Sequence, residues 1–170
     1  MTTPENPSMP GTAPDHVIGE MRVQTVREVR YFRVTTRAPF DKLDEVLDPV
    51  ILRLEAAQAE AHSATAGPVI IRYFEVDEPG IYRMDIGVPV KDDVNAAGDA
   101  EIETLPPFHC AALLYWGSLE HIGDAYGALN KAIGDAGLVH KGEGREWYLH
   151  FEGDVSPDNV IMLQLEVAAG

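Results

Sequence analysis

Apolar and polar positions follow two different periods along this chain, and each period predicts one kind of element. Residues 23–36 are rich in Val, Phe, Tyr and Thr, which is typical of a β-strand. Apolar residues recur at helical spacing over residues 47–61, which predicts a helix. Pro49 suits a first helical turn, so we expect a short turn over 40–46 and the main helix from about Asp48.

Two more predicted strands complete this half. The stretch His62–Gly67 breaks the helix, and a turn at Asp77–Gly80 separates the strands that follow it. These strands cover Pro68–Glu75 and Ile81–Val90. The first half therefore has the order strand–helix–strand–strand.

The second half repeats that order. A strand over Glu101–Tyr115 is interrupted by the pair Pro106-Pro107, and Ser118 suits the N-cap of a helix that stops at Gly137. The helix has one apolar stripe, made of Ile122, Tyr126, Leu129 and Ile133. The closing strands are Arg145–Phe151 and Val160–Val167, and the second alternates Ile161, Leu163, Leu165 and Val167 inward.

The repeat predicts an α+β fold made of two pseudo-symmetric strand–helix–strand–strand modules, an antiparallel sheet with helices. Module one covers about residues 22–91 and module two about 100–168. Pairing two such modules leaves a central groove on the pseudo-twofold axis, and ligand sites favour such junctions. Residues 1–20 are rich in Pro, Thr, Ser and Gly, and we expect them to be a disordered tail before a single domain over 21–170.

Charge and composition exclude several classes of function and location. The formal net charge of -15 repels phosphate backbones, so direct nucleic-acid binding is not expected. No apolar run approaches the ~20 residues of a membrane span, and the N-terminus lacks the features of a signal peptide. The single cysteine, Cys110, allows no internal disulfide, so we expect a cytoplasmic location. Cys110 alternates with Phe108 and Ala112, which is typical of a small buried residue.

One carboxylate stands in an aromatic strand. The segment that starts at Gly144 can be laid over the one that starts at Gly67, and Glu146 then falls where the first half has Val69. Burying an ionisable group costs several kcal/mol unless it is paired, so this asymmetry marks a site. Strand alternation places Glu146, Tyr148 and His150 on one face, which we assign to the groove, and Trp147, Leu149 and Phe151 on the other, which we assign to the helix-packed core.

The order of several motifs resembles the GyrI-like small-molecule-binding superfamily, which includes the effector-binding domains of MerR-class and AraC-class multidrug regulators. The motifs are Gly67-Pro68, the segment Asp85–Val90, Tyr115-Trp116-Gly117-Ser118, Tyr126, and Glu146-Trp147-Tyr148-Leu149. The resemblance covers about residue 22 to the end. It implies two modules around a ligand groove, and a buried glutamate, here Glu146, that accepts lipophilic cations among aromatic rings, with Tyr148 beside it.

The predicted ligand-binding residues are Glu146, Tyr148, Tyr73, Ile71, Val69, Trp116, Tyr126 and His150. Trp116 is expected at the rim of the groove, whereas Tyr126 fits either core packing or ligand contact. Aromatic walls around an acidic end suit an aromatic or cationic small molecule. The prediction is a stand-alone binding protein for such compounds, linked to transcription regulation, drug sensing or sequestration.

Two other functions stay open. Some relatives resemble hydrolases that open cyclopropane-bearing genotoxic natural products, which would make Glu146 the base and Tyr148 a hydrogen-bond donor in catalysis. A gyrase-inhibitor-type interaction with a protein partner is the lesser alternative. The six histidines show no metal-ligand spacing in the sequence, so neither a metal nor another cofactor is predicted.

Overall fold

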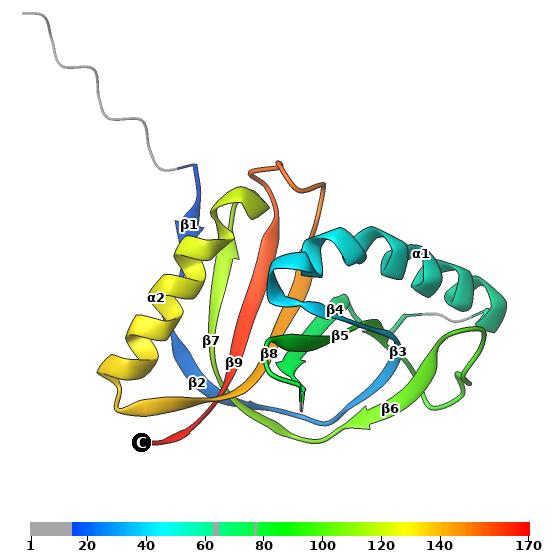
Figure 1. The fold of residues 1–170 in the computed structure, drawn as a ribbon, viewed down its shortest axis with the longest axis horizontal. Helices are drawn as coiled ribbons and strands as arrows, with labels where there is room; N and C mark the ends of the chain where they lie inside the picture. The colour runs from blue at the N-terminus through cyan, green and yellow to red at the C-terminus, as the bar shows by residue number, and fades with distance from the viewer. Residues whose placement is uncertain (1–14, 63–64, 77) are drawn as a thin grey trace, which may run out of the picture.

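The computed structural model describes residues 15–62, 65–76 and 78–170. Nine strands form one antiparallel sheet, and two helices lie on one of its faces (Figure 1). The predicted α+β class is confirmed. The strands are β1 (Val17–Ile18), β2 (Arg22–Val26), β3 (Val29–Pro39), β4 (Val69–Glu75), β5 (Ile81–Pro89), β6 (Glu101–Leu105), β7 (Phe108–Trp116), β8 (Leu138–His150) and β9 (Val160–Ala169).

The two modules share one sheet because β4 of the first half pairs with β8 of the second. The first half orders its strands β3–β5–β4, and the second orders them β7–β9–β8. Helix α1 (Leu43–Ala61) packs on β3 and β5, and α2 (Ile122–Asp135) packs on β7 and β8. A short 3-10 helix precedes each, η1 (Phe40–Lys42) and η2 (Leu119–His121). The predicted order strand–helix–strand–strand therefore holds in both halves.

Two predicted boundaries are wrong. The main helix starts at Leu43 and not near Asp48, and Pro49 lies inside it. At this interior position proline lacks the N–H that would bond to the carbonyl of Glu45, yet the helix continues through it. The N-terminal segment is also ordered earlier than residue 20, because Val17–Ile18 pairs with β7. Residues 1–14, the Ser63-Ala64 part of the helix break and Asp77 of the predicted turn lie outside the described residues.

The strand predicted over 23–36 consists of two strands with different partners. β2 pairs with β7 of the second half, whereas β3 pairs with β5 and with β6. The interruption predicted at Pro106-Pro107 is confirmed, because β6 ends at Leu105 and β7 begins at Phe108. Each half thus contributes one strand to the other, which joins the modules at both ends of the sheet.

The helix-covered face contains two apolar clusters, one under each helix. Val50, Leu54 and Ala57 of α1 pack on Phe32, Val34 and Ile86. The corresponding cluster under α2 contains Ala125, Leu129, Ile133, Leu113, Ile161, Leu163 and Leu165. Ile161, Leu163, Leu165 and Val167 are all buried, as their alternation predicts. The helices therefore rest on separate cores, and the strip of sheet between those cores includes β4 and β8.

Candidate functional site: a cavity between the two helices

A cavity of about 950 Å³ lies between the N-terminal turns of the two helices, over β4, β5 and β8. Most of its walls are apolar or aromatic. The apolar and aromatic lining residues are Phe40, Leu43, Leu47, Ile71, Tyr73, Tyr82, Met84, Leu119, Ile122, Tyr126, Tyr148 and Leu165. This volume is in the range of pockets that bind drug-sized molecules.

Glu146 lies in the wall of this cavity and is held by two tyrosines. Tyr126 Oη donates a hydrogen bond to Glu146 Oε1 at 2.5 Å, and Tyr148 Oη donates one to Oε2 at 2.7 Å. Tyr73 Oη extends this chain through a short hydrogen bond with Tyr126 Oη. Three elements, α2, β8 and β4, therefore converge on one carboxylate.

A glycine opposite Tyr73 gives that ring its position. Gly144 is the register partner of Tyr73 across the β4–β8 ladder. A Cβ at Gly144 would lie 2.5 Å from Tyr73 Cζ, closer than any real side-chain carbon approaches. Residue 144 must therefore lack a side chain for the Tyr73 ring to cross the ladder and reach Tyr126.

Burial changes the pKa values of Glu146 and of the two tyrosines that bind it. The pKa of Glu146 is raised above its ordinary value, first by desolvation and also by the negative charge of Asp44, while the hydrogen bonds from Tyr126 and Tyr148 oppose the rise. Burial and the charge of Glu146 raise the pKa of both tyrosines well above the usual range. The two phenols therefore stay protonated at neutral pH and act as donors.

The rest of the lining adds negative charge. Besides Glu146 it contains six acidic residues, Asp41, Asp44, Asp48, Glu75, Glu120 and Asp154. Within the described residues, neither lysine nor arginine lines the cavity. The hydrogen bonds to Glu146 come from neutral hydroxyl groups, so its charge is solvated but not neutralised. At the mouth, the rings of Phe40 and Tyr82 lie 5.3 Å apart, and Phe40 is 66% exposed.

The structure brings five of the eight predicted ligand residues together and leaves three outside. Glu146, Tyr148, Tyr73, Ile71 and Tyr126 line the cavity. Val69, Trp116 and His150 do not line it. Trp116 ends β7 at the far side of the sheet from β4, beside Val17 of β1.

The predicted face assignment is right for the groove residues Glu146 and Tyr148 and wrong for Trp147, which was assigned to the helix-packed core. Glu146 and Tyr148 point to the helix-covered face, while Trp147 packs on the opposite face with Tyr31, Ile70 and Leu105. The groove therefore lies on the same side of the sheet as the helices, between them. A register shift between Tyr148 and His150 also breaks the alternation, so His150 is exposed beside Glu152.

Val69 is not the counterpart of Glu146. The matching starts of the two 3-10 helices, at Phe40 and Leu119, fix the correspondence between the halves. Following the strand registers from these points relates Ile71 to Glu146, and these two residues are also direct partners across the β4–β8 ladder. The same correspondence relates Tyr73 to Tyr148 and Leu47 to Tyr126.

Sequence reasoning missed the residues that α1 and β5 contribute. Leu47 and Asp44 of α1, together with Tyr82 and Met84 of β5, line the cavity. Their signal was the acidic first turn of α1, which is hard to see when the helix is expected to start at Asp48. With the start at Leu43, Asp44 and Leu47 lie one turn apart on a single face.

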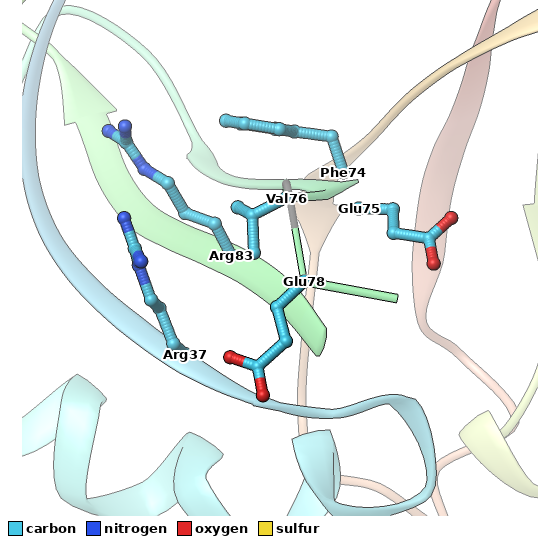
Figure 2. A pocket seen from close by; sticks show the side chains of 6 residues that line it. All are labelled: Arg37, Phe74, Glu75, Val76, Glu78 and Arg83. Carbon is cyan, nitrogen blue, oxygen red and sulfur yellow. The ribbon is translucent and has the colours of Figure 1, made fainter. Parts of the chain in front are cut away.

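A second hollow, of about 400 Å³, lies at the β4–β5 hairpin (Figure 2). It is lined by Arg37, Phe74, Glu75, Val76, Glu78 and Arg83, and Arg37 and Arg83 stand side by side as register partners of β3 and β5. Glu75 points away from the two arginines (Figure 2). Among the described residues that line this hollow, Phe74 is the single aromatic one, and both carboxylates are exposed.

The fold and the cavity define a class of small-molecule-binding domain built from two modules around a ligand site. The family model of the GyrI-like small molecule binding domain matches residues 19–165. The chain therefore belongs to the GyrI-like family. No match is found among curated protein sequences. In the described residues, neither helix has the length and apolar character needed to cross a membrane.

Solved structures share this fold at low sequence identity. The EcmrR C-terminal domain superposes with a TM-score of 0.69 at 14% identity, covering 89% of this chain and 99% of that one. SAV2435, solved bound to tetraphenylphosphonium, gives a TM-score of 0.64 at 10% identity, with 88% and 94% covered. A hydrolase from Listeria innocua gives 0.56 at 10% identity, with 88% and 92% covered.

Proposed function

We propose that this protein binds lipophilic aromatic cations in the cavity between its helices, with Glu146 as the anchor, in drug sensing or sequestration. One observation supports this most directly. Glu146 is a partly buried carboxylate whose hydrogen bonds come from neutral tyrosines, and within the described residues it forms no ion pair with a basic side chain. A cation that enters the cavity supplies the missing charge.

The walls suit the rest of such a ligand. Aromatic faces attract cations by roughly 0.5–2 kcal/mol each, and Tyr73, Tyr126 and Tyr148 surround the carboxylate. Apolar side chains, including Ile71 and Leu47, would contact the uncharged part of the molecule. SAV2435, which shares the fold, was solved with an aromatic cation, and that likeness supports the same ligand class here.

Calorimetric titration with tetraphenylphosphonium tests the proposal. Removing the charge with Glu146→Gln should weaken binding about 30-fold, which corresponds to roughly 2 kcal/mol. Glu55→Gln is the matched control, because Glu55 is exposed on α1, does not line the cavity and removes the same charge. Neutral triphenylphosphine oxide should bind wild type and Glu146→Gln with the same affinity. Equal affinity of wild type and Glu146→Gln for the cation would rule out the anchor role.

Hydrolysis is the second candidate, and one contact favours it. Tyr148 Oη lies 2.7 Å from the Glu146 carboxylate, which places a phenolic donor beside a carboxylate of raised pKa. In that role Glu146 would take a proton from a water that attacks a cyclopropane carbon. The ring C–C bond would break, and Tyr148 would donate a hydrogen bond to the conjugated carbonyl oxygen that receives the electron pair. Incubation with a cyclopropane-bearing alkylator should then yield the ring-opened product, with little product from Glu146→Gln. Turnover no higher than that of Glu146→Gln would exclude this function.

A further inference from the structure

Three metal-ligating side chains from two distant segments meet beside α2. His16 precedes β1, His121 ends the 3-10 helix η2, and Asp124 lies in the first turn of α2. One ligand atom from each lies within 4.8 Å of the others. His16 Nε2 is 3.5 Å from Asp124 Oδ2, and the two imidazole rings stack with centroids 5.1 Å apart.

The fold holds His16 against this point. Val17 pairs with Trp116 and Ile18 with Tyr115, which fixes the segment along the edge of β7. A Cβ at Gly117 would lie 2.6 Å from the Cβ of His16, so the glycine leaves the space that His16 fills. The His16 ring also lies 6.0 Å from the ring of Tyr115. His16 is therefore packed in place and does not extend freely into solvent.

These side chains converge without satisfying one another. Within the described residues, none of the three makes a side-chain hydrogen bond, and His16 Nδ1 is buried without a partner. The nitrogen that faces Asp124 is Nε2, so Nε2 and not the buried Nδ1 is the His16 atom available to a bound ion. Two imidazoles and a carboxylate form a ligand set that binds Zn²⁺ or a similar divalent ion.

We propose that His16, His121 and Asp124 form a binding site for a divalent transition-metal ion of the Zn²⁺ class. Ligand atoms about 2.0–2.2 Å from a tetrahedral zinc lie ~3.4 Å apart, and the 3.5 Å between His16 and Asp124 already matches that spacing. His121 and Asp124 are three residues apart, which places both on one side of the helix start. Water takes the remaining position.

Such an ion would tie the segment before β1 to the first turn of α2. Metal that binds only the folded chain stabilises it by mass action. The site is separate from the cavity between the helices, because none of its three residues lines that cavity. The net charge of -15 favours cation binding in general, so the test must separate this site from diffuse attraction.

The full chain, stripped with EDTA, should be titrated with Zn²⁺, Co²⁺ and Mg²⁺ in turn. Zn²⁺ at about a hundredfold excess over its Kd should raise Tm by roughly 5–10 °C. Co²⁺ should give visible d–d absorption bands of a low-coordinate nitrogen and oxygen site. Mg²⁺ should do neither, because it prefers six oxygen ligands.

Variants then decide whether these residues hold the ion. His16→Gln and Asp124→Asn should each lose most of the Zn²⁺-dependent Tm shift and the Co²⁺ bands. His109→Gln should keep both, since His109 is exposed and hydrogen-bonds Thr25 elsewhere. If His16→Gln fails to fold, Asp124→Asn still decides, because the Asp124 side chain is 63% exposed. No shift in wild type, or an equal shift in Asp124→Asn, would overturn the proposal.

Discussion

Asp85 of the first half and Glu146 of the second half are enclosed carboxylates on opposite faces of the sheet. In the first half the helix-covered face is apolar at Ile71 and Met84, and the charge lies on the other face around Asp85, which is 0% exposed. In the second half the helix-covered face carries Glu146, whereas the other face packs Phe108, Cys110, Ala112 and Met162 beside the buried guanidinium of Arg145. The correspondence between the halves relates Asp85 to Met162.

The two carboxylates also differ in what satisfies them. Asp85 accepts hydrogen bonds from Arg72 and Arg83 and forms an ion pair with Arg33, so guanidinium groups neutralise its charge. Glu146 is hydrogen-bonded by phenols, which carry no charge. The comparison teaches that a buried carboxylate paired with arginines is part of the scaffold, while one held by neutral donors keeps its charge for a ligand.

The largest effect on stability is expected when the charge of Asp85, the carboxylate paired with arginines, is removed. Asp85→Asn leaves three arginines around a neutral amide and should lower the free energy of unfolding by about 3–5 kcal/mol. Met162→Leu, at the corresponding apolar position, should cost less than ~1.5 kcal/mol because volume is nearly conserved. Urea unfolding at pH 7 measures both. A loss below ~1 kcal/mol for Asp85→Asn would mean that the arginine cluster does not depend on this carboxylate.

A second variant gives the first half the charge of the second. Ile71→Glu places a carboxylate directly across the ladder from Glu146 without a tyrosine above it, and should cost about 3 kcal/mol. Adding Leu47→Tyr supplies a donor at the position that corresponds to Tyr126, because Leu47 packs against the cluster that contains Ile71.

The double variant should regain about 1 kcal/mol relative to Ile71→Glu. Leu47→Tyr alone measures the cost of the larger ring, and urea unfolding of all three proteins completes the cycle. Equal stability of the single variant Ile71→Glu and the double variant, after that correction, would show that the tyrosine above Glu146 is not what makes its burial tolerable.

The sequence predicted the elements and the central carboxylate better than it predicted their faces. Periodicity indicated both helices and the inward row on β9, since those signals are local. The side of the sheet that faces the cavity depends on where each helix packs, which strand alternation cannot show. The counterpart of Glu146 was misjudged for a related reason, because the shared glycine and phenylalanine at the segment ends shift the alignment away from the register that pairs it with Ile71.

Long-range convergence was also beyond sequence reasoning. Tyr126 could be placed on an apolar helix stripe, but its hydrogen bond to Glu146 depends on how α2 crosses β8. His16 and His121 show no metal-ligand spacing in the chain, and only the β1–β7 pairing brings the segment of His16 to η2. Pairings between segments that are far apart in the sequence leave no periodic signal that a single chain reveals.

The smallest expected effect is a pH dependence specific to Glu146. Burial raises the pKa of this carboxyl above 4.5, so the folded chain holds its proton more tightly than the unfolded chain does. Stability from that proton is complete below the unfolded pKa and is lost as pH rises through the folded value. Because glutamine does not titrate, the unfolding free energy of wild type relative to Glu146→Gln should fall as pH rises from 4 to 7.

Ligand should reduce that pH dependence, which separates the anchor role from simple burial. A bound aromatic cation stabilises the ionised carboxylate and lowers its pKa. Saturating tetraphenylphosphonium should therefore flatten the pH dependence of the difference in unfolding free energy between wild type and Glu146→Gln. The affinity of wild type for the cation should weaken as pH falls through the raised pKa, and calorimetry in two buffers of different ionisation enthalpy should detect a released proton. If the difference in unfolding free energy keeps the same slope with and without the cation, the ligand does not meet the charge of Glu146.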